Sequence, residues 1–215
     1  KAHIGFAFDG DGDRLIIVDE KGNEVDGDKI IALFATHLLN TTQLNSKHPI
    51  ISTVMSNIGL EKYLLSHLKI KLKRSSVGDI NVIKEMQKYK SFLGGEQSGH
   101  IILSEYSKTG DGILAALKVT EIISKIRKSA SSLFNLYDDY PQVKINIKYK
   151  KISNKCIKYI NNLNRKNIKD KNNRYLIRLS GTEPIIRILV EGKNHKLAKE
   201  QANFIEKEIR INLEK

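Results

Sequence analysis

The sequence predicts an α/β fold in which a mixed-sheet domain of βαβ units precedes a small α+β domain. Between residues 26 and 138, short apolar runs alternate with segments of helical period, as expected of strands joined by helices. After the polar stretch 129–139, the expected order changes to strand, helix, strand, strand, helix. We therefore divide the chain into residues 1–25, which end one domain, the α/β domain 26–138 and the α+β domain 139–215.

Each expected element follows from its apolar pattern and its boundary residues. Apolar runs predict strands at 3–8, 15–19, 49–54, 70–77, 92–93, 100–103, 143–149, 175–179 and 185–191. Helical periodicity predicts helices at 29–39, 57–68, 79–89, 112–129, 154–164 and 195–213. Asp28 and Asp79 stand where the N-caps of two of these helices are expected. Parallel βαβ units require helices on both faces of their sheet.

The charge of the chain is strongly basic, with 37 Lys and Arg against 24 Asp and Glu and a net charge of +13. The excess Lys residues occur together with many Asn and Ile residues and are densest at 151–174. A genome rich in AT codons explains this pattern, and attraction of phosphorylated substrates is a second explanation. No nucleic-acid motif accompanies the charge, so we expect no nucleic-acid partner.

Other bulk features indicate the compartment and the context of the chain. No apolar run reaches the roughly 18 residues of a membrane span, so we expect no membrane partner. The lone cysteine, Cys156, can form no intrachain disulfide and fits a reducing cytoplasm. The chain enters a strand-like run without an initiator Met, so we expect that it starts inside a larger protein.

An acidic loop at residues 9–14 is the most specific local pattern. Asp9, Asp11 and Asp13 alternate with glycines, and Arg14 follows. Three converging carboxylates need a hard cation, and oxygen-only ligands suit Mg²⁺. Arg14 adds a second positive group for a phosphate. The alternatives are an EF-hand, which would need glycine where Arg14 stands, and a polar hairpin turn.

A glycine-rich loop at residues 94–100 is the second candidate site. Glu96, Gln97 and Ser98 can hydrogen-bond sugar hydroxyls or an amine, and His100 can donate to a phosphate or move a proton. The alternative is an ordinary connection between strands, with His100 as a core residue.

A polar turn at residues 178–184 is the third candidate site. Arg178, Ser180, Gly181 and Thr182 have the composition of a phosphate-binding turn, and Arg187 follows within reach. A simple hairpin loop with a surface arginine is the alternative.

Together the three loops resemble the α-D-phosphohexomutase superfamily, over nearly the whole chain. Members of that superfamily have four domains, and the resemblance implies that a phosphoserine lies upstream in the first. It implies that Asp9, Asp11 and Asp13 bind Mg²⁺, and that Arg14 faces the phosphoserine. The resemblance also implies that Glu96, Ser98 and His100 contact the sugar phosphate. The phosphate that does not react would be bound by Arg178, Ser180, Gly181 and Thr182.

Within the superfamily, the run Gly-Gly-Glu-Gln-Ser-Gly-His at 94–100 and the run Ser-Gly-Thr-Glu-Pro at 180–184 resemble phosphoglucosamine mutases. The phosphomannomutase/phosphoglucomutase branch usually carries Met where Gln97 stands. The resemblance implies an isomerase that interconverts glucosamine 6-phosphate and glucosamine 1-phosphate through a bisphosphate, on the route to UDP-N-acetylglucosamine. Its partner is a phosphorylated amino sugar, and a homodimer is compatible with it.

One departure from the superfamily pattern concerns residues 77–81. Ile80 and Asn81 follow Gly78-Asp79, where a basic residue and an aromatic are usual, and Lys84 one turn later is a candidate substitute. Two alternatives therefore stay open: a phosphomannomutase/phosphoglucomutase, and a catalytically inactive sugar-phosphate-binding remnant. With the serine upstream, we expect the 215-residue chain alone to be inactive.

Overall fold

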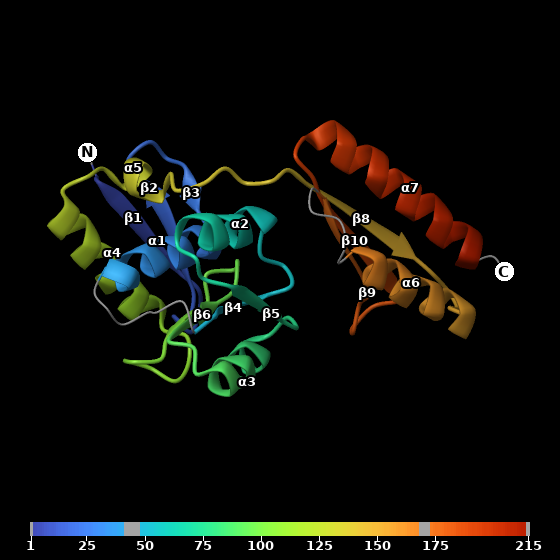
Figure 1. The fold of residues 1–215 in the computed structure, drawn as a ribbon, viewed down its shortest axis with the longest axis horizontal. Coiled ribbons are helices and arrows are strands. Elements are labelled where there is room, and N and C mark those ends of the chain that lie inside the picture. The colour runs from blue at the N-terminus through green and yellow to red at the C-terminus, as the bar shows by residue number, and fades with distance from the viewer. Residues whose placement is uncertain (1, 41–47, 168–172, 214–215) are drawn as a thin grey trace. The chain divides into compact units, whose positions relative to one another are not determined.

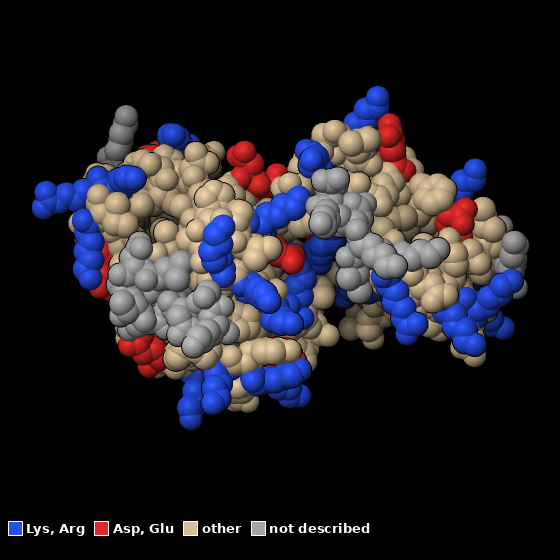
Figure 2. Space-filling view, in the orientation of Figure 1, with Lys and Arg blue, Asp and Glu red and all other residues tan. Residues whose placement is uncertain are grey.

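The computed structural model describes residues 2–40, 48–167 and 173–213, which form two units, Lys1–Asp139 and Tyr140–Lys215 (Figure 1). Figure 2 shows Lys and Arg side chains spread over the visible face of each unit, with Asp and Glu fewer among them. Among the described residues, no helix has both the length and the apolar character that a membrane span requires.

The first unit opens with a small antiparallel sheet of order β1-β2-β3. Its strands are β1 (Ile4–Phe8), β2 (Leu15–Asp19) and β3 (Glu24–Val25). Phe8 pairs with Leu15 across the acidic loop, so the loop closes a hairpin. Leu15 and Ile17 alternate into the core and are fully buried, which fixes the face of β2 that packs inward.

A four-stranded mixed sheet of order β5-β4-β6-β7 forms the rest of the frame. Its strands are β4 (Ile50–Thr53), β5 (Leu72–Ser75), β6 (Leu93–Gly95) and β7 (Ile101–Leu103), and the helices of the unit are α1 (Gly27–Asn40), α2 (Ile58–His67), α3 (Asp79–Tyr89), α4 (Gly112–Ile126) and α5 (Ala130–Phe134). Strands β5, β4 and β6 run parallel, and β7 pairs with β6 antiparallel. The predicted mixed sheet with βαβ connections is therefore confirmed.

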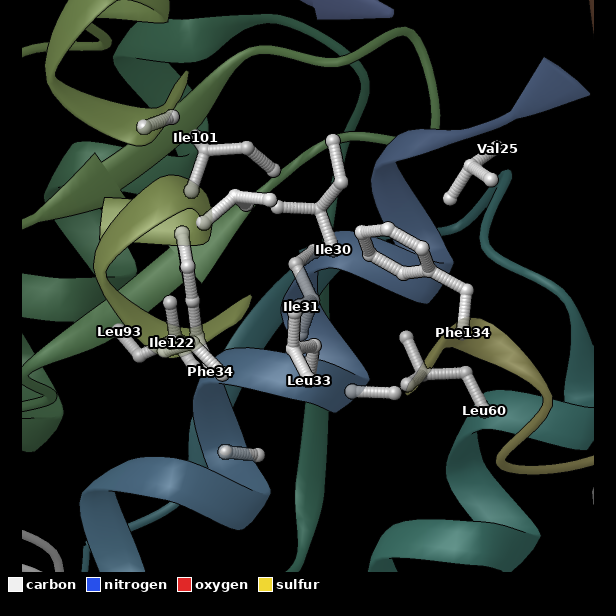
Figure 3. Packing of buried hydrophobic residues seen from close by; sticks show 14 of the residues in the cluster. Val25, Ile30, Ile31, Leu33, Phe34, Leu60, Leu93, Ile101, Ile122 and Phe134 are labelled. Carbon is white, nitrogen blue, oxygen red and sulfur yellow. The ribbon is translucent and has the colours of Figure 1, made fainter. Parts of the chain in front are cut away.

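Helices cover both faces of this sheet, as the sequence predicts. Along β4, Ile50 packs into the core cluster that contains α1, whereas its neighbour Ile51 packs against Val82 and Met86 of α3. Successive strand residues point to opposite faces, so both must be apolar when both faces are covered. Figure 3 shows the larger cluster, in which α1 contributes Ile30, Ile31, Leu33 and Phe34 against Leu60, Leu93, Ile101, Ile122 and Phe134.

The starts of helices α1 and α3 differ from the sequence expectation. Asp28 is not the cap of α1, because the Asp26 carboxylate accepts the Lys29 backbone N–H at 3.2 Å and Asp28 lies inside the first turn. Asp79 is the first residue of α3, and Gly78 stands at its N-cap with a φ of 112°. Because glycine has no side chain, Gly78 can favour the start of α3 only through its backbone conformation.

The predicted helix 112–129 is divided in two. Helix α4 ends at Ile126 because Arg127 adopts a left-handed φ of 54°. Ser129 then caps the short helix α5 by accepting the Ser132 backbone N–H. The apolar periodicity of the sequence continues across this break. The break is visible only in the backbone conformation of Arg127.

The second unit is a small α+β layer structure, as predicted. Its antiparallel sheet has the order β8-β10-β9, with β8 (Gln142–Lys148), β9 (Arg174–Leu179) and β10 (Ile185–Glu191). Helices α6 (Asn154–Asn167) and α7 (His195–Leu213) pack on it around one core that includes Ile160, Ile188 and Ile205. The Lys- and Asn-rich segment 151–174 is described except for residues 168–172.

Candidate active site

The acidic loop between β1 and β2 brings three carboxylates together. Asp9, Asp11 and Asp13 each offer an oxygen, and these oxygens lie within 4.8 Å of one another. The turn closes through a hydrogen bond from the Gly12 N–H to the Asp9 carbonyl at 3.2 Å, and Gly12 has a φ of 73° that favours glycine. Because strands flank the loop, the EF-hand alternative is wrong.

The charges in this loop are only partly balanced by protein groups. The Arg14 Nε lies 3.6 Å from an Asp9 oxygen and 3.9 Å from Asp13 Oδ1. Burial and the neighbouring Asp9 carboxylate raise the pKa of Asp13, and His100 opposes this rise. Partial burial acts to raise the pKa of Asp9 too, but the hydrogen bond from the Arg14 backbone N–H, the neighbouring Asp13 carboxyl and the Arg14 charge outweigh it and lower that pKa. The loop is therefore short of positive charge.

One oxygen in the loop indicates a ligand. Asp13 Oδ1 is buried and has no hydrogen-bond partner among the described residues. A buried carboxylate oxygen without a partner costs free energy, and a bound cation would satisfy it. An all-oxygen donor set with this unsatisfied atom fits Mg²⁺.

Backbone contacts join the acidic loop to the glycine-rich loop. The Leu15 N–H donates to the Gly99 carbonyl at 3.0 Å, and Arg14 forms a β-bridge with His100. A Cβ on Gly99 would lie 2.2 Å from the Leu15 carbonyl oxygen. Only glycine permits this approach, so the sequence fixes the distance between the two loops at this position.

The start of α4 supports the acidic loop from another side. The Gly112 N–H donates to the Gly12 carbonyl at 3.0 Å. A Cβ on Gly112 would come within 2.6 Å of the Arg14 carbonyl oxygen. Sequence analysis missed this support, although Gly110 and Gly112 flanking the helix cap Asp111 were a visible pattern.

His100 is held at both ring nitrogens and is only 2% exposed. The Gly110 backbone N–H donates to Nε2 at 3.1 Å, so Nε2 acts as an acceptor. The proton of a neutral ring then sits on Nδ1, which donates to Asp13 Oδ2 at 2.9 Å. Both ring nitrogens thus have partners within the first unit, and the phosphate donor that the sequence suggested stays a prediction. The hydrogen bond from Nδ1 holds the Asp13 carboxylate in one orientation.

The sugar loop, residues 96–98, follows β6 at the carboxyl end of the parallel strands, where ligands of open α/β sheets bind. Glu96 is buried, and its Oε1 accepts the Gly78 N–H from the loop after β5 at 3.0 Å. Its Oε2 accepts the exposed Ser98 hydroxyl at 3.5 Å. Gln97 is half-buried and donates through Nε2 to Asp26 at 3.1 Å. The structure thus brings the three predicted sugar-loop residues beside Gly78 and Asp26, neither of which the sequence analysis had selected as part of the site.

The departure at Ile80 lies at this same edge. Ile80 is 61% exposed, and it follows Gly78 by two residues at the start of α3. Lys84 is exposed one turn later on the same helix.

The polar turn at residues 178–184, the candidate phosphate loop, lies in the second unit and joins β9 to β10. Arg178 and Arg187 are directly paired across these strands, and Arg187 forms an ion pair with Glu183 at 3.1 Å. Two like charges opposite one another destabilise a strand pair unless an anion or a counter-ion accompanies them. Ser180 donates its N–H to the Ile185 carbonyl, which closes the turn.

Gly181 plays no conformational role in this turn. Its φ is not left-handed, and an added Cβ would meet no atom within 4 Å. Gly181 and Thr182 are exposed, and Ser180 is half-buried. The open space around Gly181 is compatible with an approaching anion, and that role stays a prediction.

Two family matches cover most of the chain. Residues 26–140 match "Phosphoglucomutase/phosphomannomutase, alpha/beta/alpha domain III", and residues 145–208 match the C-terminal domain of the same family. The chain belongs to the phosphoglucomutase/phosphomannomutase family.

Among curated proteins, the chain is similar to phosphoglucosamine mutases. It is 48% identical over 198 residues to that of Sulfurovum sp. (strain NBC37-1), covering 91% of this chain and 44% of the relative. It is 44% identical over 209 residues to that of Campylobacter curvus (strain 525.92), covering 96% of this chain and 46% of the relative. The chain therefore spans about half the length of the curated relatives it matches.

Solved structures share the fold at low sequence identity. A phosphoglucomutase/phosphomannomutase family protein from Burkholderia thailandensis matches with a TM-score of 0.80 and 21% identity, over 98% of this chain and 47% of the other. An N-acetylphosphoglucosamine mutase from Aspergillus fumigatus, in complex with GlcNAc-6P and magnesium, matches with a TM-score of 0.73 and 19% identity, over 93% of this chain and 50% of the other. These likenesses support the fold.

Proposed function

We propose that the intact protein is a phosphoglucosamine mutase, which interconverts glucosamine 6-phosphate and glucosamine 1-phosphate. The observation that carries the proposal is the hydrogen bond between Asp13 and His100, because it joins the acidic loop to the sugar loop in one unit. The curated phosphoglucosamine mutases at 48% and 44% identity support the choice of sugar. Residues 1–25, 26–138 and 139–215 would be the end of the second domain, the third and the fourth.

In this proposal, each loop has a separate task. Asp9, Asp11 and Asp13 would hold Mg²⁺, which when bound supplies positive charge to the phosphoryl group in transfer. Arg14 adds a guanidinium beside the same carboxylates. The transferring group would come from a phosphoserine upstream of this chain and pass to the free sugar position, which gives a bisphosphate and a free serine. The bisphosphate would then give its other phosphoryl group back to that serine.

We assign contact with the sugar to the sugar loop, and contact with the phosphate that does not react to the phosphate loop. Glu96, Gln97 and Ser98 present acceptors and a hydroxyl to the sugar. The set for the non-reacting phosphate is Arg178, Ser180, Gly181, Thr182 and Arg187. We assign His100 to orienting Asp13, because both its ring nitrogens are already engaged within the first unit.

The test is a mutase assay on the full-length protein with glucosamine 6-phosphate and glucose 6-phosphate side by side. Turnover of the amino sugar that requires Mg²⁺ and the upstream serine supports the proposal. Preference for glucose or mannose phosphates would assign the protein to the phosphomannomutase/phosphoglucomutase branch. No turnover of any sugar phosphate, with binding retained, would make it an inactive sugar-phosphate-binding protein.

The setting of the enzyme is part of the proposal. The single cysteine, Cys156, is buried, which is compatible with a reducing cytoplasm as the compartment. Self-association into a homodimer stays a proposal from the family resemblance, and light scattering on the full-length protein tests it.

A further inference from the structure

Asp26 contacts the sugar loop from the start of α1. Its Oδ2 accepts a hydrogen bond from the Gln97 side-chain Nε2 at 3.1 Å, across 71 positions of sequence. Its other oxygen, Oδ1, accepts the Lys29 backbone N–H and caps the helix. Both carboxylate oxygens are therefore occupied, which holds the Asp26 side chain in one orientation.

The backbone of the sugar loop is fixed by the same segment. The Gly27 N–H donates to the Gln97 carbonyl at 2.9 Å. A Cβ on Gly27 would lie 2.0 Å from the Glu96 carbonyl oxygen, so the helix start packs directly on the loop. Gln97 is therefore held at its main chain and at its side chain by two consecutive residues.

The contact with Asp26 decides which end of the Gln97 amide is free. An ionised carboxylate has only acceptors, so it must take the NH₂ end of the amide. Among the described residues, nothing donates to the opposite atom, Oε1, and Oε1 is not one of the buried side-chain atoms left without a partner. Oε1 is thus an acceptor that solvent, or a substrate, can reach.

We propose that Asp26 is a positioning residue for sugar choice, because it orients the Gln97 amide with its oxygen toward the substrate amine. This inference rests on the proposed function. A protonated amine is only a donor, so it needs an acceptor such as Oε1 and is repelled by an NH₂ group. A sugar hydroxyl donates and accepts, so it tolerates either end of the amide. A fixed amide therefore favours the amino sugar over glucose phosphates.

The experiment uses the intact enzyme with Asp26→Asn. Asparagine is isosteric and remains a good N-cap, so α1 is retained, but its amide lets Gln97 pair in either orientation. We expect the ratio of kcat/KM for glucosamine 6-phosphate over glucose 6-phosphate to fall about 10-fold or more, as for a lost hydrogen bond to a charged group. Asp111→Asn is the matched control, because Asp111 caps α4 in the same way and does not touch Gln97.

A double-variant cycle separates positioning from a general effect on the fold. With Gln97→Met in place, Asp26→Asn should leave the ratio unchanged, since no amide remains to be oriented. An unchanged ratio in Asp26→Asn alone would overturn the inference, and so would an equal fall for both sugars. A wild-type enzyme that does not turn over the amino sugar would overturn the proposed function itself, and that result is read before any variant is made.

Discussion

Replacement of Asp28 by Asn should change how the stability of the first unit depends on pH. Asp28 is fully buried at the start of α1, and its Oδ2 accepts the Asn57 backbone N–H at 2.7 Å. Burial, then the neighbouring Asp26, raises its pKa from 3.8 to about 7, against the opposing effects of Asn57, Ser56 and Arg74. Removal of the carboxylate from water therefore outweighs its hydrogen bonds.

The sign follows from the raised pKa in the folded state. The fold favours the neutral carboxylic acid, so this stability is fully present below about pH 4 and is lost as the pH rises through about 7. The difference is about three pH units, at about 1.4 kcal/mol per unit, or about 4 kcal/mol in all. About two of these three units lie between pH 5 and the raised pKa near 7, so Asp28→Asn, which carries no charge, should gain about 3 kcal/mol relative to wild type between pH 5 and pH 8.

The assay is urea unfolding of the 215-residue chain at pH 5, 6, 7 and 8, followed by far-UV circular dichroism because the chain has no tryptophan. Asp79→Asn is the matched control, since Asp79 is an exposed carboxylate in the first turn of α3. The reasoning is refuted if the difference between Asp28→Asn and wild type stays constant across this range. A difference that shrinks as the pH rises would mean that Asp28 is ionised and stabilised in the fold.

Three further changes test the other sites. Asp11→Asn in the intact enzyme should lower turnover by orders of magnitude, because one metal ligand and one charge are lost; Mn²⁺ titration and mutase assays measure it. Arg178→Ala should raise KM about 10- to 150-fold and lower kcat less, since a grip on the non-reacting phosphate binds ground state and transition state alike. Glu191→Gln should destabilise the second unit by about 3 kcal/mol in urea unfolding, because it leaves Arg174 without the fully buried carboxylate that now pairs with it.

Each of these predictions has an opposing result. If Asp11→Asn kept wild-type metal affinity and turnover, the assignment of the acidic loop as the metal site would be wrong. If Arg178→Ala lowered kcat alone, the arginine would act on the transferring group. For Glu191→Gln, the matched variant is Glu183→Gln on the exposed ion pair with Arg187, and an equal, small effect of both would show that the buried pair adds nothing.

The sequence alone was sufficient to predict the three loops and most of the element order, but not strand β3 or the separate helix α5. The short run of β4, buried at every position, and the helical period of α7 both indicate which residues lie in the core. The loops were visible because Asp9, Asp11 and Asp13 stand within five positions, as do Arg178, Ser180 and Thr182. Ligands that are local in sequence can be predicted from composition.

The helix starts show where local reading fails. Asp26 and Asp28 are both good caps by residue type, and only the chain path decides which of them precedes the helix. The structure places Asp26 at the cap and sends Asp28 into the core, where it meets the β4–α2 loop at Asn57. Nothing within a few residues of Asp28 in the sequence indicates that partner.

The sequence by itself determined which chemical groups this protein carries and on which loops they lie. The tertiary structure decided their pairing: Asp13 meets His100 across 87 positions, and Asp26 meets Gln97 across 71. A hydrogen bond requires atoms within about 3 Å, a distance that depends on how strands and helices pack. The roles that we propose for His100, in orienting Asp13, and for Asp26, in orienting Gln97, could therefore be inferred only from the folded chain.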